Sequence, residues 1–321
     1  MRIPVVFAFD SNYALPASVA IASLLAVKNS ETEYEIIVFH GGLSSRTRRR
    51  FEAICPIRWV QVSPGDVGDV PIGYSGLATW YRLLLAKLLP DRDRVIWSDV
   101  DVLFRDDLSA AFQMDLNGAA WAGVVVENSE APDGYHCRWG NNPCIYIPSL
   151  MVADIAKWRR QGLTEVFLEN VRTRRDELRL FDLDVLNMSC SPIAALPFSY
   201  CVLENVMYSD DVTRAHEWPW LRHHYSREDL ECAKREPVII HYAGGRSPKV
   251  WRRRRERIPD EYWSWLEKSP FFDREYFFPG WRTALRRFWW SAVSRVMPLK
   301  SQRQACRARR FRPLAKDADP A

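Results

Sequence analysis

The sequence predicts an α/β fold, a Rossmann-like mixed sheet flanked by helices. Short apolar runs alternate with helical patterns over the first hundred residues, which favours strands wrapped by helices. The chain has 321 residues, 47% of them hydrophobic and 26% charged, which is ordinary globular composition. Its seven cysteines include no C-x-x-C pair, which argues against a disulfide scaffold and a cysteine-built zinc site.

The first hundred residues supply four expected strands. Residues 3–9 form an unbroken apolar run, typical of a strand buried on both faces, and Pro16 then opens a helical stretch. Further strands are expected at residues 34–39, 58–62 and 94–97. Ser44 and Ser45 can cap a basic helix that runs through Ile54, and residues 77–88 form another helix. This alternation predicts a parallel arrangement for the first half of the sheet.

The later part of the chain is less regular. Residues 119–126, 145–153 and 238–242 are expected as strands, and residues 155–160 and 165–176 as helices. Residues 127–143 are rich in Gly, Asn and Pro and are expected as a loop. No segment has the length and apolarity of a transmembrane helix.

Positive charge is concentrated at the C-terminus. From Trp281 onward eleven Lys or Arg face two acids, a net charge of +9, whereas the first 280 residues carry −4. We therefore divide the chain into a domain over residues 1–270 and a basic, aromatic tail over residues 271–321. Any anionic surface that the protein binds should contact the tail.

Polar residues follow two of the expected strands. Asp10, Asn12 and Tyr13 come after the first strand, and Asp99 and Asp101 after the fourth. In open α/β sheets, ligands bind at the carboxyl ends of the strands. The chain has neither a dinucleotide-binding glycine fingerprint nor a P-loop, so other groups would have to bind the phosphates of a nucleotide.

Asp99 and Asp101 are candidate metal ligands. Two carboxylates two residues apart in extended chain point to one side and can share one hard cation. The alternative is a solvated turn, which the flanking apolar residues disfavour. His241 could complete the site, because neutral imidazole ligates Mn²⁺. The glycines of the following turn and Lys249 could bind a pyrophosphate, although a structural histidine and an ordinary turn are the alternatives.

Taken together, these motifs resemble glycosyltransferase family 8, whose members are retaining enzymes with nucleotide-sugar donors and a GT-A fold. The resemblance runs from residue 3 to about residue 251. It begins with residues 6–13, which look like the family's uridine site on the first strand and include Ala8. It implies that Asp10 and Asn12 bind uracil or ribose and that Tyr13 stacks on the base.

The same resemblance implies roles for the remaining motifs. Arg82 matches an arginine near the diphosphate and donor sugar, and the helix at residues 154–159 matches the one after the sugar-site strand. The Asp99, Val100 and Asp101 triplet matches the metal-binding D-x-D motif, with His241 as third protein ligand. Gly244 and Lys249 resemble the pyrophosphate-binding residues of an H-x-x-G-x-x-K-P-W motif.

Departures from the family concentrate around the sugar. Residues 147–149 read Ile-Pro-Ser where members usually have Asn-Ser/Ala-Gly, and Leu183 stands where many have a Gln facing the anomeric carbon. The last motif has extra residues before Lys249 and Val250 in place of Pro. Asp182 is expected to hold donor-sugar hydroxyls. The alternative for Asp182 and Asp184 is that they are acids favoured by a helix N-terminus.

The expected function is retaining transfer of a hexose, galactose or glucose, from UDP-galactose or UDP-glucose to a saccharide or lipid-linked glycan such as lipopolysaccharide. Mn²⁺ (or Mg²⁺) would stabilise the UDP leaving group, with Asp182, Arg82 and Lys249 as catalytic residues. Leucine has no nucleophilic atom, so Leu183 favours attack from the leaving-group face. The alternative is a catalytically impaired UDP-sugar-binding protein.

The tail has the pattern of an interfacial helix. Trp, Phe, Leu and Val recur at helical spacing from Trp281 to Val296, and arginines lie mostly on the other side. We expect peripheral attachment at the cytoplasmic face of the cell membrane, the alternative being a helix docked on its own domain. No nucleic-acid partner is expected, because the −4 body lacks a basic face.

Overall fold

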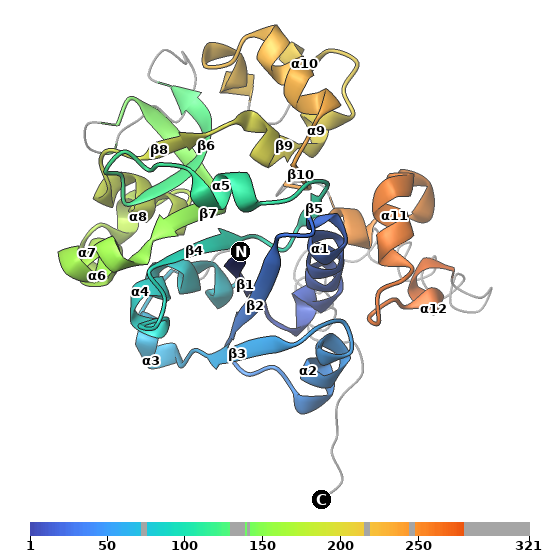
Figure 1. Ribbon diagram of the computed structural model, residues 1–321, viewed down its shortest axis with the longest axis horizontal. Helices are drawn as coiled ribbons and strands as arrows, with labels where there is room; N and C mark the ends of the chain where they lie inside the picture. Colours follow the sequence, from blue (N-terminus) through green and yellow to red (C-terminus); the bar gives the residue numbers. More distant parts are fainter. Residues whose placement is uncertain (72–75, 129–138, 140–141, 215–218, 244–247, 279–321) are drawn as a thin grey trace, which may run out of the picture.

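The computed structural model describes residues 1–71, 76–128, 139, 142–214, 219–243 and 248–278 (Figure 1). A large sheet contains β1 (Arg2–Ala8), β2 (Glu33–His40), β3 (Ile57–Gln61), β4 (Arg94–Ser98), β6 (Trp121–Asn128), β7 (Cys144–Asp154) and β8 (Ala194–Leu196). Its strand order is β3-β2-β1-β4-β7-β6-β8. A small sheet contains β5 (Val102–Phe104), β9 (Val202–Leu203) and β10 (Ile239–His241), in the order β5-β10-β9.

The large sheet is mixed, as the sequence predicts. β1 pairs in parallel with β2 and β4, and β2 pairs in parallel with β3, which confirms the alternation of strands and helices. β7 then lies antiparallel to both β4 and β6. The central strands β1 and β4 are almost wholly buried, so their sequences are continuous apolar runs without polar alternation.

Helices cover both faces of the large sheet and extend beyond it. They are α1 (Ala14–Val27), α2 (Ser45–Glu52), α3 (Pro64–Val67), α4 (Leu85–Leu88), α5 (Ser109–Gln113), α6 (Ile155–Gln161), α7 (Leu163–Thr173), α8 (Asp182–Ser189), α9 (Glu204–Met207), α10 (Arg227–Arg235), α11 (Asp260–Leu266) and α12 (Arg274–Phe277). Ser44 caps α2 by accepting a hydrogen bond from the backbone N–H of Thr47. α1 contacts both β5 and α11, which explains why most of its residues are buried (Figure 1). Within the described residues, none of these helices combines the length and apolarity that a membrane crossing requires.

One expected helix takes a different form. Residues Leu77–Leu84 form a 3₁₀ helix, and only Leu85–Leu88 continue as the α-helix α4. Side chains three residues apart align on one side of a 3₁₀ helix. Thr79 and Arg82 are such a pair, and both contact Asp182. The helix expected over residues 165–176 is also shorter, because α7 ends at Thr173.

The Asp99–Asp101 segment joins the two sheets. It lies between β4 and β5 as a bend, whereas the sequence analysis placed it in extended chain. The chain bends here because it leaves the large sheet and enters the small one. The Asp99 N–H donates to the carbonyl of Ser149 at 2.7 Å, and the Tyr242 N–H donates to the carbonyl of Asp101 at 2.8 Å. These bonds fix the bend against β7 and the end of β10.

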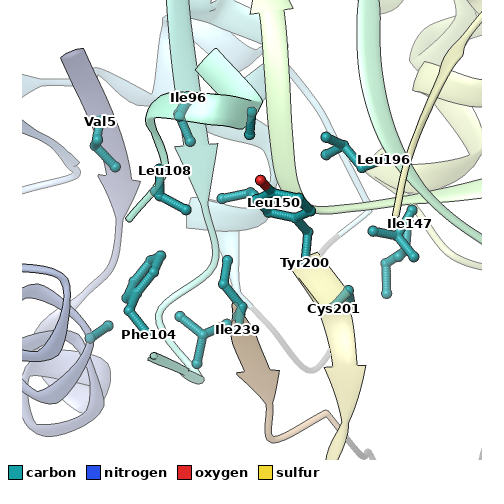
Figure 2. Close-up of a cluster of buried hydrophobic side chains, with 14 of the residues drawn as sticks. Val5, Ile96, Phe104, Leu108, Ile147, Leu150, Leu196, Tyr200, Cys201 and Ile239 are labelled. Carbon is teal, nitrogen blue, oxygen red and sulfur yellow. The ribbon is translucent and has the colours of Figure 1, made fainter. Parts of the chain in front are cut away.

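A hydrophobic core packs between the two sheets. Figure 2 shows Ile96 of β4, Phe104 of β5 and Leu150 of β7 beside Cys201 and Ile239 of the small-sheet region. Burial of each large apolar side chain contributes about 1.5–3 kcal/mol to folding. This core holds the small sheet, and therefore His241, in a fixed position relative to the Asp99–Asp101 bend.

Candidate functional site

A cleft of about 250 Å³ lies at the carboxyl ends of β1 and β4. Most of the residues that the sequence predicts for the site line it: Ala8, Asp10, Tyr13, Arg82, Asp99, Val100, Asp101, Asp182, His241 and Lys249. Asn12 does not line it, but its side chain donates a hydrogen bond to Asp10. Gly244 lies outside the described residues. The fold therefore brings into one cleft side chains that lie up to 241 positions apart in the sequence.

Three of these residues form a candidate metal site. One ligand atom from each of Asp99, Asp101 and His241 lies within 4.8 Å of the others. Nε2 of His241 is 3.4 Å from Oδ1 of Asp101 and 4.0 Å from Oδ2 of Asp99. In an octahedral Mg²⁺ or Mn²⁺ site, neighbouring ligand atoms lie about 3 Å apart. A small movement of the three side chains toward one another would bring their ligand atoms to that spacing. Two carboxylates and one imidazole suit Mn²⁺ or Mg²⁺, Mn²⁺ better because it accepts nitrogen.

Two cationic side chains orient the carboxylates. Nη2 of Arg82 lies 2.8 Å from Oδ1 of Asp99, and Nζ of Lys249 lies 2.7 Å from Oδ2 of Asp101. Each cation thus holds one oxygen of its carboxylate and leaves the other oxygen facing His241. Arg82 is itself buried, with a guanidinium that also donates to the carbonyl of Pro148 at 2.7 Å. This arrangement fixes the direction in which the ligand oxygens point.

The charged groups of the site shift the pKa values of Asp101 and His241. Burial favours the neutral form of Asp101, but Lys249 and His241 hold the pKa of its carboxyl well below the usual range. Burial likewise opposes charge on His241, but the Cys201 thiol and the Asp101 carboxylate raise the pKa of its imidazole well above the ordinary value. In the metal-free site these contacts therefore favour the protonated form of His241.

This raised pKa predicts that the affinity for Mn²⁺ increases with pH. A cation can bind Nε2 only after the imidazole loses its proton, and the raised pKa moves that loss above about pH 6.5. Titrating the protein with Mn²⁺ at several pH values between about 6 and 9 measures the effect. The dependence should flatten in His241→Asn, whose amide does not titrate. An affinity of the unmodified protein that stays constant over this range would contradict the prediction.

A buried ion pair connects the metal-site end to the opposite wall of the cleft. Nε of Arg82 lies 2.8 Å from Oδ2 of Asp182, and the Thr79 hydroxyl donates to Oδ1 at 2.9 Å. Burial raises the pKa of Asp182 to about 6 despite the opposing charge of Arg82, with repulsion from Asp99 adding to the rise. Arg82 and Thr79 together engage both oxygens of Asp182.

Asp184 occupies a different place from Asp182. It does not line the cleft, and its carboxylate accepts hydrogen bonds from the backbone N–H groups of Arg179 and Leu180 and from the Trp139 indole. Its contacts therefore fix the loop before α8. The alternative of an acid favoured by a helix N-terminus therefore fits Asp184. Asp182 lies in the same first turn of α8 but also lines the cleft.

Asp10 and Tyr13 form the end of the cleft near β1. The Asp10 carboxylate accepts hydrogen bonds from the backbone N–H of Asn12 at 2.9 Å and from its side chain at 3.2 Å. The Tyr13 ring lies edge-on to Trp251, with centroids 5.6 Å apart. An exposed acid beside an aromatic ring can bind a nucleoside through hydrogen bonds and stacking.

The opposite end of the cleft is apolar. Ile147, Leu180 and Leu183 line it, together with the ring of Pro148. Ile147 and Leu183 are the positions at which the sequence departs from its family. Asp182, the Thr79 hydroxyl that binds it and the Arg82 guanidinium lie beside this wall.

Two contacts of the site were not expected from the sequence. Thr79 binds Asp182, and Cys201, with its thiol 3.5 Å from Nδ1 of His241, lies behind the metal site. No motif marks either residue, because each acts through a neighbour that only the folded chain supplies. The hydroxyl of the exposed Tyr208 lies 3.1 Å from that of the buried Tyr242, and neither residue lines the cleft.

Comparison with known proteins agrees with this architecture. The profile of glycosyl transferase family 8 matches residues 4–255, and the chain belongs to this family of glycosyltransferases. General stress protein A of Bacillus subtilis is 24% identical over 283 residues, covering 84% of this chain and 89% of that protein. A putative glycosyltransferase of Haemophilus influenzae is 21% identical over 296 residues, covering 83% and 84%.

Solved structures show the same fold. The galactosyltransferase LgtC in complex with donor and acceptor sugar analogues superposes with a TM-score of 0.67 at 22% identity, covering 85% of this chain and 99% of that one. An active-site mutant of LgtC gives a TM-score of 0.69 at 21% identity, with the same coverage. The described part of the chain therefore has a GT-A-like fold, as the sequence analysis expected.

Proposed function

We propose that this glycosyltransferase transfers a hexose, galactose or glucose, with retention of configuration, from a UDP-sugar to a saccharide acceptor. One observation carries the proposal. Asp99, Asp101 and His241 meet in the cleft between an end that contains Asp10 and Tyr13 and a second end at Asp182. A donor has the same three-part order: base, diphosphate and sugar.

Each part of the donor has a matching group in the cleft. Asp10 and Tyr13 would bind uridine, with Asn12 fixing the Asp10 carboxylate. Asp99, Asp101 and His241 would hold Mn²⁺ or Mg²⁺, which neutralises charge on a diphosphate when bound. Gly244 and Lys249 would bind the pyrophosphate through a backbone N–H and an ammonium group.

The chain's own cations would stabilise the leaving group. Negative charge accumulates on UDP as its bond to the sugar breaks, and fixed cations at that point lower the barrier. Nζ of Lys249, which contacts Asp101 at 2.7 Å, would exchange this contact for a phosphate oxygen. Arg82 is held on two sides by Asp99 and Asp182, so it is preorganised between the diphosphate and the sugar.

Retention is proposed to follow from attack on the leaving-group face. Leu183 offers no nucleophile, and both oxygens of Asp182 are already bound by Arg82 and Thr79. Asp182 is therefore assigned to the donor-sugar hydroxyls, using its remaining lone pairs. A phosphate oxygen of the donor would take the proton of the acceptor hydroxyl as the new glycosidic bond forms.

The test is release of UDP from purified protein supplied with UDP-galactose or UDP-glucose and Mn²⁺. We expect release with one of these donors and little release when the metal is chelated. Release that needs no divalent cation would overturn the role of the metal, and no release despite tight donor binding would overturn the enzymatic proposal.

The second candidate is a UDP-sugar-binding protein with impaired turnover. The apolar wall of Ile147, Leu180 and Leu183 favours it, because a hexose presents hydroxyls that these side chains cannot bind. This candidate predicts that UDP-galactose or UDP-glucose raises the melting temperature in the presence of Mn²⁺ while no UDP is released.

We also propose that residues 1–270 form the transferase domain and that residues 271–321 attach it to the cytoplasmic face of an anionic membrane, where lipopolysaccharide or another lipid-linked glycan would be the acceptor. The start of this tail packs on the domain: the Phe271 ring lies 4.7 Å from that of Phe51. Arg252, Arg254 and Arg257 line a further exposed basic cleft. Each cation near an anionic leaflet contributes about 1 kcal/mol to binding.

Removing the residues after Trp281 is therefore expected to abolish binding to anionic vesicles. Donor-dependent UDP release should persist, because the described cleft contains none of the removed residues. Cosedimentation with vesicles containing phosphatidylglycerol measures binding, with phosphatidylcholine vesicles as control. Equal binding of the full chain to both vesicle types would contradict the electrostatic account.

A further inference from the structure

We propose that Cys201 is a positioning residue for His241: its thiol accepts the Nδ1–H hydrogen bond and so leaves the Nε2 lone pair for the divalent cation. The inference deepens the proposed function and rests on its metal site. Cys201 carries no signal in the sequence.

The two ring nitrogens of His241 face different groups. Nδ1 lies 3.5 Å from Sγ of Cys201, a distance at which a sulfur hydrogen bond forms. Nε2 faces the carboxylates of Asp101 and Asp99 at 3.4 and 4.0 Å. The imidazole therefore has one nitrogen on the ligand side and the other toward the core.

A metal-binding histidine must be neutral, with its lone pair on the ligating nitrogen and its proton on the other. That proton needs an acceptor, because a buried N–H without one costs about 1–3 kcal/mol. Among the residues that the structure describes, Cys201 is the side chain placed to accept at Nδ1. The thiol thus fixes both the tautomer and the angle of the ring.

Cys201 is itself held firmly. Its side chain is fully buried in the core between the two sheets (Figure 2). Sγ lies 3.1 Å from the Ser149 hydroxyl, so the thiol can donate to Ser149 while it accepts from His241. β9, which begins at the next residue, pairs in parallel with β10, and this places Leu203 opposite His241.

Ser149 links the thiol to the other side of the metal site. Its carbonyl accepts the N–H of Asp99 at 2.7 Å, while its hydroxyl contacts Cys201. One residue of β7 therefore supports both the Asp99 ligand and the group behind the His241 ligand. Supporting hydrogen bonds of this kind typically change metal affinity by about 10–100-fold when removed.

The test measures Mn²⁺ binding without donor or turnover, from the electron paramagnetic resonance signal of free Mn²⁺. Cys201→Ala should bind Mn²⁺ about 10–100-fold more weakly, because Nδ1–H loses its acceptor. Cys201→Ser should retain most of the affinity, because its hydroxyl can accept the same bond. Cys190→Ala is the matched control: Cys190 is also buried but lies outside the cleft, and its replacement should leave the affinity unchanged.

Three outcomes would overturn the positioning role. The first is unchanged affinity in Cys201→Ala, and the second is an equal loss in Cys201→Ser. The third is a sulfur-to-metal charge-transfer band in the Co²⁺-loaded protein, which would make Cys201 a direct ligand. Asp101→Ala distinguishes failure of the Cys201 inference from failure of the proposed metal site. Unchanged Mn²⁺ affinity in that variant would overturn the metal site, and the inference would fall with it.

A measurement on the unmodified chain keeps the test independent of whether Cys201→Ala folds. In the protein loaded with diamagnetic Cd²⁺, ¹⁵N resonances of the His241 ring should show a proton on Nδ1 and metal on Nε2. Metal on Nδ1, or a proton on Nε2, would overturn the proposal.

Discussion

Replacing Asp101 with alanine is expected to abolish metal-dependent release of UDP from the sugar donor. The substitution removes a proposed metal ligand and also the partner that holds Lys249, whose Nζ lies 2.7 Å from Oδ2 of Asp101. Loss of one electrostatic stabiliser of a developing anion costs about 3–4 kcal/mol, or 10²–10³-fold in rate. Because two stabilisers fail together, the loss should be at least of this size. Continuous measurement of UDP release under saturating donor checks it.

Asp106→Ala serves as the control for this substitution. Asp106 lies just beyond the other end of β5, is exposed, and does not line the cleft. It should retain full activity and Mn²⁺ affinity. Asp101→Ala with the turnover of the unmodified protein would show that the D-x-D motif is a structural bend only.

Replacing Arg82 with methionine is expected to destabilise the fold as well as stop turnover. The side chains of Arg82 and Asp182 are only 6% and 8% exposed, so the substitution leaves a buried carboxylate without its cation. Removing one partner of a buried ion pair typically costs about 3–5 kcal/mol. Asp99 loses its contact with the same guanidinium, which adds to the cost. Urea denaturation of the metal-free protein measures the change in unfolding free energy.

A second substitution distinguishes the stability lost with the ion pair from the stability lost with the packing of the Arg82 side chain. Asp182→Asn in the Arg82→Met background removes the uncompensated charge and should recover part of the lost stability. Arg175→Met is the surface control, because Arg175 and Asp69 form an exposed pair that should contribute about 0–1 kcal/mol. If Arg82→Met costs no more than Arg175→Met, the buried network does not stabilise the fold.

The meeting of Asp10, Asp99, Asp101 and His241 in one cleft could be predicted because its signals are local in sequence. Asp10 and Asp99 each follow a continuous apolar strand, and parallel pairing of β1 with β4 brings those strand ends together. His241 could be predicted because it ends a short apolar strand. The parallel half of the sheet followed in the same way from the alternation of strands and helices.

Contacts made across the fold could not be predicted. The 3₁₀ form of Leu77–Leu84 depends on the burial of Trp80 and on the Asp182 carboxylate, which lies a hundred residues further on. The bend at Asp99 follows from a second sheet whose strand β5 has three residues, too short for a periodic pattern. Cys201 has no role until β9 lies beside β10, and only the folded chain shows that pairing.

The most direct measurement is the position of Mn²⁺ in crystals of the protein grown with UDP, located by anomalous scattering. The account predicts one peak bounded by Asp99, Asp101 and Nε2 of His241, with the diphosphate of UDP beside Lys249. A manganese peak away from these three side chains, or UDP bound with no metal between its phosphates and the protein, would contradict it.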